Sequence, residues 1–362
     1  MPLTTLDLFA GAGGLTAGFH AASEEFETKR AIELDADAVA TFNANHGEGV
    51  ARAVAIEEWL EGDEPEELRE EGLDIVVGGP PCQGFSALGK RDVNDARNSL
   101  WEKYAETLRR TNAKYFVVEN VATFLTSTQF EAFRKATTDG DLRDWTFEAR
   151  VLNAADYGAP QARKRAVLLG HRRDVPALNF PEPTHDRAGS SGRQAWKDVR
   201  WAFDAALERK AIPARARSTW PGSTKAQAAP ARTDELHVDR TYTQLSKDRF
   251  AAIPAGGNRF DIPDELLSRC WRDHKTGSGD VMGRLRWDKP AVTIRTEFFK
   301  PEKGRYLHPE ENRAITHWEA ARLQGFPDDY LWHGSRTSVA RQIGNAVPVQ
   351  LGSAIAKTVL QP

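Results

Sequence analysis

Short apolar runs and longer segments of helical periodicity alternate along the first 170 residues. The apolar runs predict buried strands at residues 3–9, 75–78 and 115–118, one ending near residue 33, and a short one around residues 50–56. Helices are predicted between them at residues 15–22, 39–43 and 99–110. Residues 146–152 and 166–170 predict a final antiparallel pair. This alternation predicts a doubly wound, Rossmann-like α/β sheet.

The pattern changes after His171. Residues 176–260 are rich in Pro, Gly, Arg and scattered Trp, and their periodicity is weak. Because this aromatic content is too high for a solvated linker, we expect a second, irregular domain. Thr316 and Glu319 then form a capping-box pattern that predicts a helix ending before Gly325. A last helix is predicted to start at Pro348.

Composition narrows the class of protein. The chain has 362 residues, of which 40% are hydrophobic and 28% charged, and no apolar run is long enough to span a membrane. The N-terminus enters a strand directly without a basic region, so no signal peptide is expected. Two cysteines, Cys82 and Cys270, provide neither a disulfide framework nor a zinc site. These features predict a cytoplasmic protein without a metal.

Charge is unevenly distributed along the chain. The net charge is −3, but residues 1–80 carry 18 acidic and 4 basic side chains, a net of −14, which leaves +11 for the remainder. Residues 187–232 hold ten basic and three acidic side chains. A segregated basic region of this kind attracts polyanions, although a solvated Ala/Arg-rich surface explains the same pattern.

A glycine-rich turn follows the first predicted strand and predicts a cofactor site. Gly11, Gly13 and Gly14 allow close backbone approach before a helix N-terminus, and Glu33 stands at a strand end where a carboxylate can hold ribose hydroxyls. A dinucleotide-binding turn would have a third glycine where this chain has Thr16, and no Arg or Lys lies nearby to bind a pyrophosphate. The pattern therefore favours a ligand with ribose and carboxylate but no phosphate, such as S-adenosylmethionine.

Candidate catalytic groups cluster at the ends of the predicted strands. Cys82 follows the stiff Pro80-Pro81 pair just beyond the strand at residues 75–78, where a thiolate would be exposed and firmly held. Glu119 follows the fifth predicted strand and should lie at the same edge of the sheet. Arg163 and Arg165 precede the strand at residue 166 and share one face by strand alternation.

Six motifs in order along the chain resemble those of bacterial DNA cytosine-5 methyltransferases. The resemblance begins with residues 7–15, the cofactor motif, with Glu33 as its acidic ribose contact. It continues through Pro80-Pro81-Cys82-Gln83, Glu119-Asn120-Val121 and Gln161-Ala162-Arg163-Lys164-Arg165. It ends with Arg322-Leu323-Gln324-Gly325-Phe326-Pro327 and Gln342-Ile343-Gly344-Asn345-Ala346-Val347-Pro348.

The resemblance implies a catalytic mechanism. The Cys82 thiolate would add to C6 of a cytosine flipped out of duplex DNA, which makes C5 nucleophilic toward the methyl group. Glu119 would protonate or hydrogen-bond N3 of the base. Arg165 would bind O2 and help to keep Cys82 ionised, and Arg163 would position Glu119. The polar residues 86–98 would close over the flipped base.

The resemblance also assigns a cofactor pocket to S-adenosylmethionine, with S-adenosylhomocysteine as the product. Phe9 and Leu34 would flank the adenine, and the backbone of Ile56 would bind it. The family usually has an acidic residue one position earlier, where this chain has Ala55. The other contacts would come from Leu15, Pro81, Leu100, Asn345 and Val347, and the last two require the C-terminal helix to pack on the first domain.

By the same resemblance, residues 1–180 completed by 335–362 form the catalytic domain and residues 181–334 recognise the target. The basic, Trp-bearing stretch and the loop at residues 277–279 would face double-stranded DNA in a nucleoid-associated enzyme. A restriction nuclease or another defence-system partner is compatible with this role. Two alternatives stay open, namely a tRNA cytosine-5 methyltransferase of the same fold and a catalytically retired DNA-binding protein.

Overall fold

The structure, a computed structural model, describes residues 2–81, 100–190, 192–207, 230–273 and 276–361. The chain forms two compact units. Unit 1 comprises Met1–Tyr157, Lys164–Thr184 and Val347–Pro362, and unit 2 comprises Gly158–Arg163 and His185–Ala346. The sequence placed the domain boundaries at residues 180/181 and 334/335. The predicted nucleophile Cys82 and all of residues 86–98, which were predicted to close over the base, lie outside the described residues.

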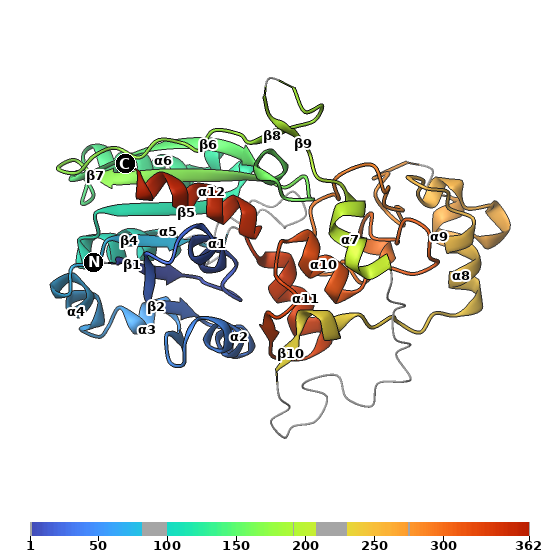
Figure 1. The fold of residues 1–362 in the computed structure, drawn as a ribbon, viewed down its shortest axis with the longest axis horizontal. Helices are drawn as coiled ribbons and strands as arrows, with labels where there is room; N and C mark the ends of the chain where they lie inside the picture. The colour runs from blue at the N-terminus through green and yellow to red at the C-terminus, as the bar shows by residue number, and fades with distance from the viewer. Residues whose placement is uncertain (1, 82–99, 191, 208–229, 274–275, 362) are drawn as a thin grey trace. The chain divides into compact units, whose positions relative to one another are not determined.

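The described part of unit 1 is built on a seven-stranded sheet with the order β3-β2-β1-β4-β5-β7-β6 (Figure 1). The strands are β1 (Leu3–Leu8), β2 (Phe26–Glu33), β3 (Ala51–Ala53), β4 (Ile75–Gly78), β5 (Tyr115–Val121), β6 (Trp145–Asn153) and β7 (Lys164–Arg172). Strands β1 to β5 are parallel, and β7 runs antiparallel to both β5 and β6. This confirms the predicted α/β sheet and its antiparallel pair. Strand order reverses at β1 and β4, where such folds bind ligands.

Helices cover both faces of this sheet. On one face, a buried apolar cluster joins the strands to α3 (Ile56–Trp59), α4 (Glu64–Glu70), α5 (Leu100–Thr111) and α6 (Thr128–Thr138). The remaining helices of unit 1 are α1 (Gly14–Ala22), α2 (Ala36–His46) and α12 (Val349–Leu360). Because side chains alternate along a strand, Leu6 and Leu8 of β1 point into this cluster. Thr5 and Asp7 point to the opposite face of the sheet.

The C-terminal helix packs within unit 1, as expected from the resemblance, and its partner there is the N-terminal helix. α1 and α12 lie side by side in front of the sheet (Figure 1). They approach closely because glycines face each other: a Cβ atom built on Gly18 would lie 2.6 Å from Gly352 Cα. Residues more than three hundred positions apart therefore complete one layer of unit 1.

In the part of unit 2 that the structure describes, there is little sheet, and short helices and turns organise the chain. Its helices are α7 (Val199–Leu207), α8 (Gln244–Ala251), α9 (Arg269–Arg272), α10 (His317–Leu323) and α11 (Arg336–Asn345). Its strands form two short pairs, β8 (His185–Asp186) with β9 (Gln194–Ala195) and β10 (Ala231–Arg232) with β11 (Leu331–Trp332). The predicted capping box is present, since Thr316 Oγ1 accepts from Glu319 N and Glu319 Oε2 accepts from Thr316 N.

Several sequence predictions need correction. The third strand ends at Ala53, and Ile56 begins helix α3 because residues 56–59 turn an apolar side inward. Strand β5 extends to Val121, so Glu119 lies within the strand rather than after it. Helices α4, α6, α7, α8 and α11 were not predicted, since the polar composition of most of them obscures their apolar faces.

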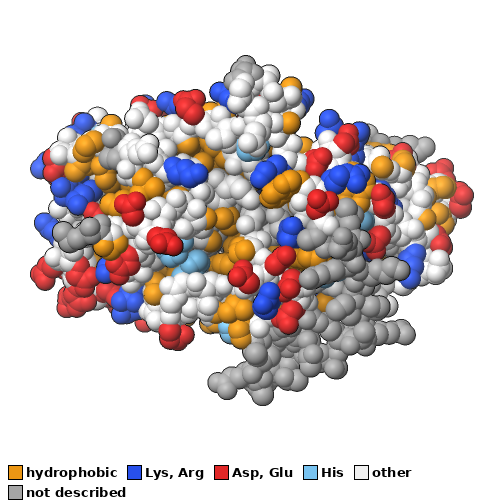
Figure 2. All heavy atoms as spheres, viewed as in Figure 1, with side chains coloured by type: hydrophobic (Ala, Val, Ile, Leu, Met, Phe, Trp, Pro, Cys, Tyr) orange, Lys and Arg blue, Asp and Glu red, His pale blue; other side chains and the backbone are white. Residues whose placement is uncertain are grey.

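The acidic N-terminal region forms part of the surface of unit 1. Glu64, Glu66 and Glu67 occupy the first turn of α4, where carboxylates are favoured by the helix dipole. Figure 2 shows acidic side chains gathered at the end of unit 1 that carries this helix. Among the described residues, no helix is long and apolar enough to cross a membrane.

Candidate active site

The turn after β1 has the backbone geometry of a ligand-binding loop. Phe9 has a φ of 56°, a left-handed conformation that is uncommon outside glycine, and Gly11 and Gly13 also have positive φ values of 56° and 82°. Gly13 caps α1 without a side chain, and no acidic residue lies in the first turn. The direction in which a Gly11 side chain would point is open for 4 Å. The turn therefore offers helix N–H groups and space to an anionic group.

Glu33 links this turn to the start of α2. Its Oε2 atom accepts a hydrogen bond from Gly11 N, and its Oε1 atom accepts one from Asp35 N, each at 2.9 Å. Both oxygens are thus oriented by backbone donors while the side chain stays partly exposed. This arrangement fixes a carboxylate beside the glycine turn, where the sequence placed a ribose contact.

The structure brings together some, but not all, of the apolar residues that were predicted to line the cofactor pocket in unit 1. Phe9, Ile56 and Leu100 all belong to, or pack against, the same apolar cluster. Leu34 is 73% exposed at the start of α2, so its side chain is available to a flat ligand. Ala55 caps α3 without a side-chain hydrogen bond, which leaves a methyl group where the family usually has a carboxylate.

A histidine that the sequence did not suggest lies behind the glycine turn. A Cβ atom on Gly13 would lie 2.7 Å from His46 Nε2 and 3.0 Å from a ring carbon of Phe42. Burial, and secondarily the charge of His20, lower the pKa of His46 to about 3, so His46 is a neutral packing group. Nothing in the spacing of α2 could have revealed this contact.

The reaction edge is formed by the ends of β4 and β5. Asn120 Nδ2 donates a hydrogen bond to the carbonyl oxygen of Pro80 at 2.9 Å, and both groups are buried. A Cβ atom on Gly79 would lie 3.1 Å from Glu119 Oε2, so the loop that leads to Cys82 passes directly against Glu119. The sequence named Glu119 and Pro81 as site residues but not Asn120. The position of Asn120 inside the Glu-Asn-Val motif could have indicated that it is a site residue.

Glu119 is held by an arginine of the neighbouring strand. Arg165 Nε lies 2.6 Å from Glu119 Oε1, and both side chains are largely buried. Strand register explains the pair: Arg165 is opposite Val121 and Val167 is opposite Glu119, so Arg165 and Glu119 are diagonal neighbours on one face. In this structure, therefore, Arg165 is in direct contact with Glu119, the residue that the sequence expected Arg163 to position.

Three of the motifs meet inside unit 2 through buried amides. Gln161 Nε2 donates to Gln324 Oε1 at 2.8 Å, and both side chains are fully buried. Gln324 Nε2 in turn donates to the carbonyls of Ile343 and Ala346. Gln161 Oε1 accepts from Ile294 N at 2.8 Å. The segments around residues 161, 324 and 344 thus form one satisfied polar network.

Arg163 and Asn345 belong to the same part of unit 2. The buried Arg163 guanidinium donates to the carbonyls of Ile294, at 2.8 Å, and Gly344, at 3.1 Å. Its predicted role toward Glu119 stays a prediction. Asn345 ends α11 with an exposed side chain, whereas Val347, two residues later, is buried in unit 1.

The basic stretch of unit 2 carries cations seated on indole rings. Lys197 Nζ lies 3.7 Å from the ring centroid of Trp201, which is 47% exposed. The Arg187 guanidinium lies 5.5 Å from the ring centroid of Trp196. Such stacking orients cationic groups on a surface without neutralising them. We call Arg187, Trp196, Lys197 and Trp201 the cation–indole surface.

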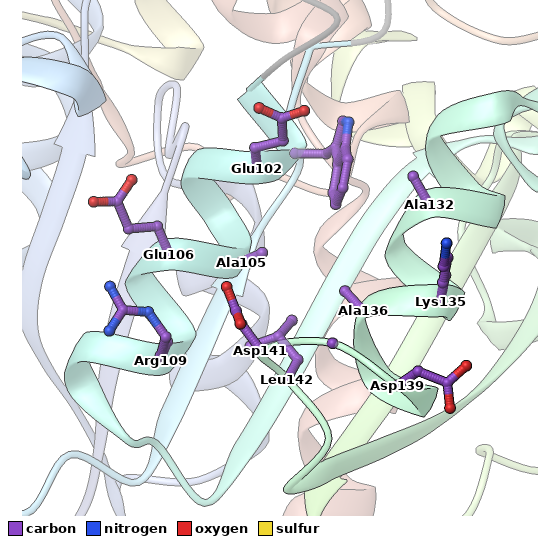
Figure 3. Close-up of a pocket in the computed structure, with 12 residues that line it drawn as sticks. Glu102, Ala105, Glu106, Arg109, Ala132, Lys135, Ala136, Asp139, Asp141 and Leu142 are labelled. Carbon is purple, nitrogen blue, oxygen red and sulfur yellow. The ribbon is translucent and has the colours of Figure 1, made fainter.

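A surface pocket of about 540 Å³ lies between α5 and α6, away from the predicted site residues. Its floor is apolar, and its rim is charged. Glu106 and Arg109 project from α5, Lys135 projects from α6, and Asp139 follows the end of α6 (Figure 3). None of the predicted site residues lines it. Among the described residues, no group of three or more His, Cys, Asp or Glu side chains could hold a metal ion.

We compared the chain with known proteins to identify its family. The family model of the C-5 cytosine-specific DNA methylases matches residues 3–361. The chain belongs to this family. As a C-5 cytosine-specific DNA methylase, it is an enzyme.

Curated relatives match this methylase over nearly its whole length. It is 31% identical to "Type II methyltransferase M1.HphI" of Haemophilus parahaemolyticus over 366 residues, which cover 100% of this chain and 87% of the relative. It is 33% identical to "Type II methyltransferase M.XorII" of Xanthomonas oryzae pv. oryzae over 376 residues, which cover 98% of this chain and 84% of the relative.

Solved structures share the fold of this methylase at low identity. A prophage-encoded E. coli protein described as a DNA modification methyltransferase aligns with a TM-score of 0.69 and 22% identity, covering 99% of this chain and 98% of that one. A Spodoptera frugiperda DNMT2 variant aligns with a TM-score of 0.59 and 15% identity, covering 99% of both chains. These matches confirm the predicted fold class.

Proposed function

We propose that this methylase transfers a methyl group from S-adenosylmethionine to C5 of a cytosine flipped out of a specific duplex DNA sequence, through a covalent bond between Cys82 and C6. The observation that carries the proposal is the juxtaposition of the Glu119–Arg165 pair and the Asn120–Pro80 hydrogen bond at one sheet edge. The chain enters the nucleophile loop from that edge. A thiol delivered there would meet a carboxyl group already held by Arg165.

The proposed chemistry gives a task to each residue at this edge, and the contacts of Glu119 and Arg165 support theirs. The Cys82 thiolate adds to C6, and the electron pair moves toward N3 and C5 of the ring. Glu119 hydrogen-bonds or protonates N3 as negative charge arrives there. Arg165 holds Glu119 at 2.6 Å and also presents N–H donors to O2 of the base. Loss of the C5 proton to water and expulsion of Cys82 complete the reaction.

The residues around the glycine turn fit S-adenosylmethionine. The uncapped N-terminus of α1 suits a carboxylate, and the oriented Glu33 carboxylate suits ribose hydroxyls. Phe9, Leu34, Ile56 and Leu100 would enclose the adenine and methionine portions. Val347 and Pro81, which also belong to unit 1, would complete this part of the pocket, and the contact of Asn345 with the cofactor stays a prediction. When bound, the cofactor supplies an activated methyl group and leaves as S-adenosylhomocysteine.

Trapping of the covalent adduct tests the chemistry. A duplex containing 5-fluorocytosine cannot lose its C5 substituent as a proton, so the enzyme should remain attached to it in denaturing gels when cofactor is present. Cys82→Ala should abolish both trapping and methyl transfer. Cys270→Ala, which removes the other cysteine, is the matched control and should retain both. Trapping by the Cys82→Ala variant would contradict the mechanism.

Substrate preference separates the proposal from its alternatives. With labelled cofactor we expect methyl transfer to duplex DNA and none to tRNA. Transfer to tRNA alone would support the RNA alternative, and DNA binding without transfer would support a retired enzyme. Because the curated relatives are named Type II methyltransferases, we also propose a restriction-modification setting. Sequencing of 5-methylcytosine in DNA from expressing cells would give the target sequence, which a cognate nuclease should then fail to cut.

A further inference from the structure

Phe260 is a large apolar side chain that the packing of unit 2 leaves in solvent. It is 50% exposed, although a phenylalanine ring is among the side chains that gain most from burial. It lies in the short 3-10 helix η6 (Arg259–Asp261), which neither the proposed chemistry nor the cofactor pocket uses. Single exposed apolar residues are common on protein surfaces, so exposure alone does not assign a role to Phe260.

The turn that presents Phe260 is held by several hydrogen bonds. Asn258 Oδ1 accepts from Phe260 N at 2.9 Å, and Asp261 Oδ2 accepts from Asn258 N at 2.7 Å. Arg259 N donates to the carbonyl oxygen of Val281 at 3.1 Å. These bonds fix the backbone on both sides of the ring before any partner binds. A ring presented in this way loses little conformational entropy when a partner covers it.

Arg305 joins this turn to a second loop. Its guanidinium donates to the carbonyl oxygen of Gly257 at 2.9 Å and to that of Gly279 at 2.8 Å. The loop at residues 277–279, which the sequence expected to face DNA, is therefore tied to the turn that carries Phe260. The ring and this loop form one rigid surface of unit 2.

A guanidinium covers part of the Phe260 ring. Arg259 Cζ lies 4.5 Å from the ring centroid, so the exposed part of the ring is the part away from this cation. Arg259 is 6% exposed, its Nη2 atom donates to the carbonyl oxygen of Thr276, and its Nε atom is buried without an acceptor. No acidic side chain of the described residues pairs with it. The turn thus combines an exposed aromatic ring with a cation that is not neutralised.

The unit that carries Phe260 is the basic one. Unit 2 contains 29 basic and 21 acidic side chains, a net of +8, whereas unit 1 contains 20 basic and 31 acidic, a net of −11. A polyanion is therefore attracted to unit 2. Because the chain belongs to a family of DNA methylases, that polyanion is DNA. An aromatic ring beside an arginine suits DNA, in which the flat faces of bases lie next to phosphates.

We propose that Phe260, backed by Arg259, inserts into the base stack of the bound duplex and stacks on a base close to the target cytosine. An inserted ring unstacks one base step, and its stacking on the base offsets part of that cost. The DNA is then already distorted beside the cytosine that has to leave the helix. Phe260 would thus contact the substrate DNA without taking part in the chemical step. The inference rests on the proposed function.

Binding measurements on ring variants test the stacking. The probe is a duplex with the sequence that the enzyme methylates, as read from 5-methylcytosine sequencing, and the readout is fluorescence anisotropy. Phe260→Ala should weaken binding about ten- to a hundredfold, which is what stacking of one base on an aromatic ring contributes. The dependence of affinity on salt should not change, because no charge is removed. Phe260→Tyr keeps a ring and should bind like the wild type, whereas Phe260→Leu should remain weak.

A matched control separates stacking from a general loss of apolar surface. Leu245→Ala removes a comparably exposed side chain of unit 2, 46% exposed on α8, and should bind like the wild type. The Phe260 variants should also unfold at the wild-type temperature, since half of the side chain is already in solvent.

2-Aminopurine placed at successive positions of the duplex locates the insertion. On binding of the wild type, its fluorescence should change at the target position and at one further step. Phe260→Ala should lose only the second change. Wild-type affinity of Phe260→Ala, restoration of affinity by Phe260→Leu, or the lack of a second fluorescence change in the wild type would overturn the inference. Failure of the wild type to methylate duplex DNA would instead refute the proposed function.

Discussion

Asn120 Nδ2 donates a hydrogen bond to Pro80 O at 2.9 Å, and this contact joins the end of β5 to the loop that leads into Cys82. Asn120 Oδ1 accepts from the backbone N–H of Val121, which fixes the orientation of the amide. The side chain is 5% exposed, so water cannot easily replace the hydrogen bond. Asn120 thus anchors the backbone two residues before the nucleophile.

Removal of this anchor should impair the chemical step. Asn120→Ala leaves the Pro80 carbonyl without its buried donor, which costs about 1–3 kcal/mol. We expect kcat for methyl transfer to fall at least about tenfold, with little change in the dissociation constant of the cofactor. Single-turnover kinetics and cofactor titration would separate the two effects. Asn45→Ala, at a surface-proximal asparagine of α2, is the control and should leave kcat unchanged. A normal kcat in Asn120→Ala would show that the loop is positioned by other contacts.

A second prediction concerns protein stability and follows from the close contact between α1 and α12. Gly18→Ala would normally stabilise a helix interior, but here the new Cβ atom would lie 2.6 Å from Gly352 Cα. Because backbone on both sides must shift, we expect a loss of about 1–3 kcal/mol in unfolding free energy. The effect should be smaller for Gly352→Ala, whose nearest contact would be 3.2 Å away.

Denaturant titration would measure the unfolding free energy of the two variants and show whether Gly18→Ala is the more destabilising. Gly62→Ala is the control, because its Cβ atom would meet nothing closer than 3.6 Å and the backbone does not require glycine. It should be neutral within about 0.5 kcal/mol. Equal stability of the Gly18→Ala variant and the wild type would mean that the two helices separate at little cost.

The sequence predicted the sheet well because buried strands keep an apolar pattern whatever surrounds them. It also predicted the glycine turn and the helix cap at Thr316, which depend on local backbone requirements. It could not predict the Arg165–Glu119 pair, since that contact depends on the register between β5 and β7. For the same reason, the sequence assigned Arg165 roles toward the base and toward Cys82 but no contact with Glu119.

Polar contacts between residues far apart in the chain could not be predicted from the sequence either. Gln161 and Gln324 lie 163 positions apart, and nothing in either motif shows that their amides meet. The contact of His46 with Gly13 could not be predicted either, because it depends on how α2 packs and not on the residues next to His46 in the chain. Helices α4 and α6 were missed for a different reason: their exposed faces are strongly charged, which hides a narrow apolar side.

A buried ion pair in unit 2 predicts how stability depends on pH. Arg313 forms two hydrogen bonds to Glu319, at 2.8 Å each, and both side chains are buried. Burial alone would raise the pKa of Glu319, but the charge and hydrogen bonds of Arg313 outweigh it and lower the pKa from 4.5 to about 2. The folded pKa is below the unfolded value. The resulting stabilisation is therefore present above pH 4.5 and is lost as pH falls toward 2.

Glu319→Gln should remove this pH-dependent contribution and leave Arg313 without its buried counter-ion. We expect a loss of about 3–5 kcal/mol at pH 7. The difference between variant and wild type should shrink as pH falls from 4.5 to 3. Thermal unfolding across this range would measure it, with Glu131→Gln on the exposed side of α6 as the control. A difference that stays constant with pH would contradict the assignment to Glu319.

The cation–indole surface makes the last prediction, which concerns DNA. Lys197 lies over the half-exposed ring of Trp201, and the Arg187 guanidinium lies similarly over Trp196. Lys197→Gln should weaken binding to duplex DNA similarly for every sequence and reduce the salt slope, the change in log affinity with log salt concentration, by about 1. Trp201→Ala should give a smaller loss, because the lysine remains but is no longer oriented. Fluorescence anisotropy at several salt concentrations would measure both effects. Lys29→Gln, a lysine of β2 paired with Glu27, is the matched control, and its slope should equal that of the wild type. If Lys197→Gln also kept the wild-type slope, this surface would not contact the DNA backbone.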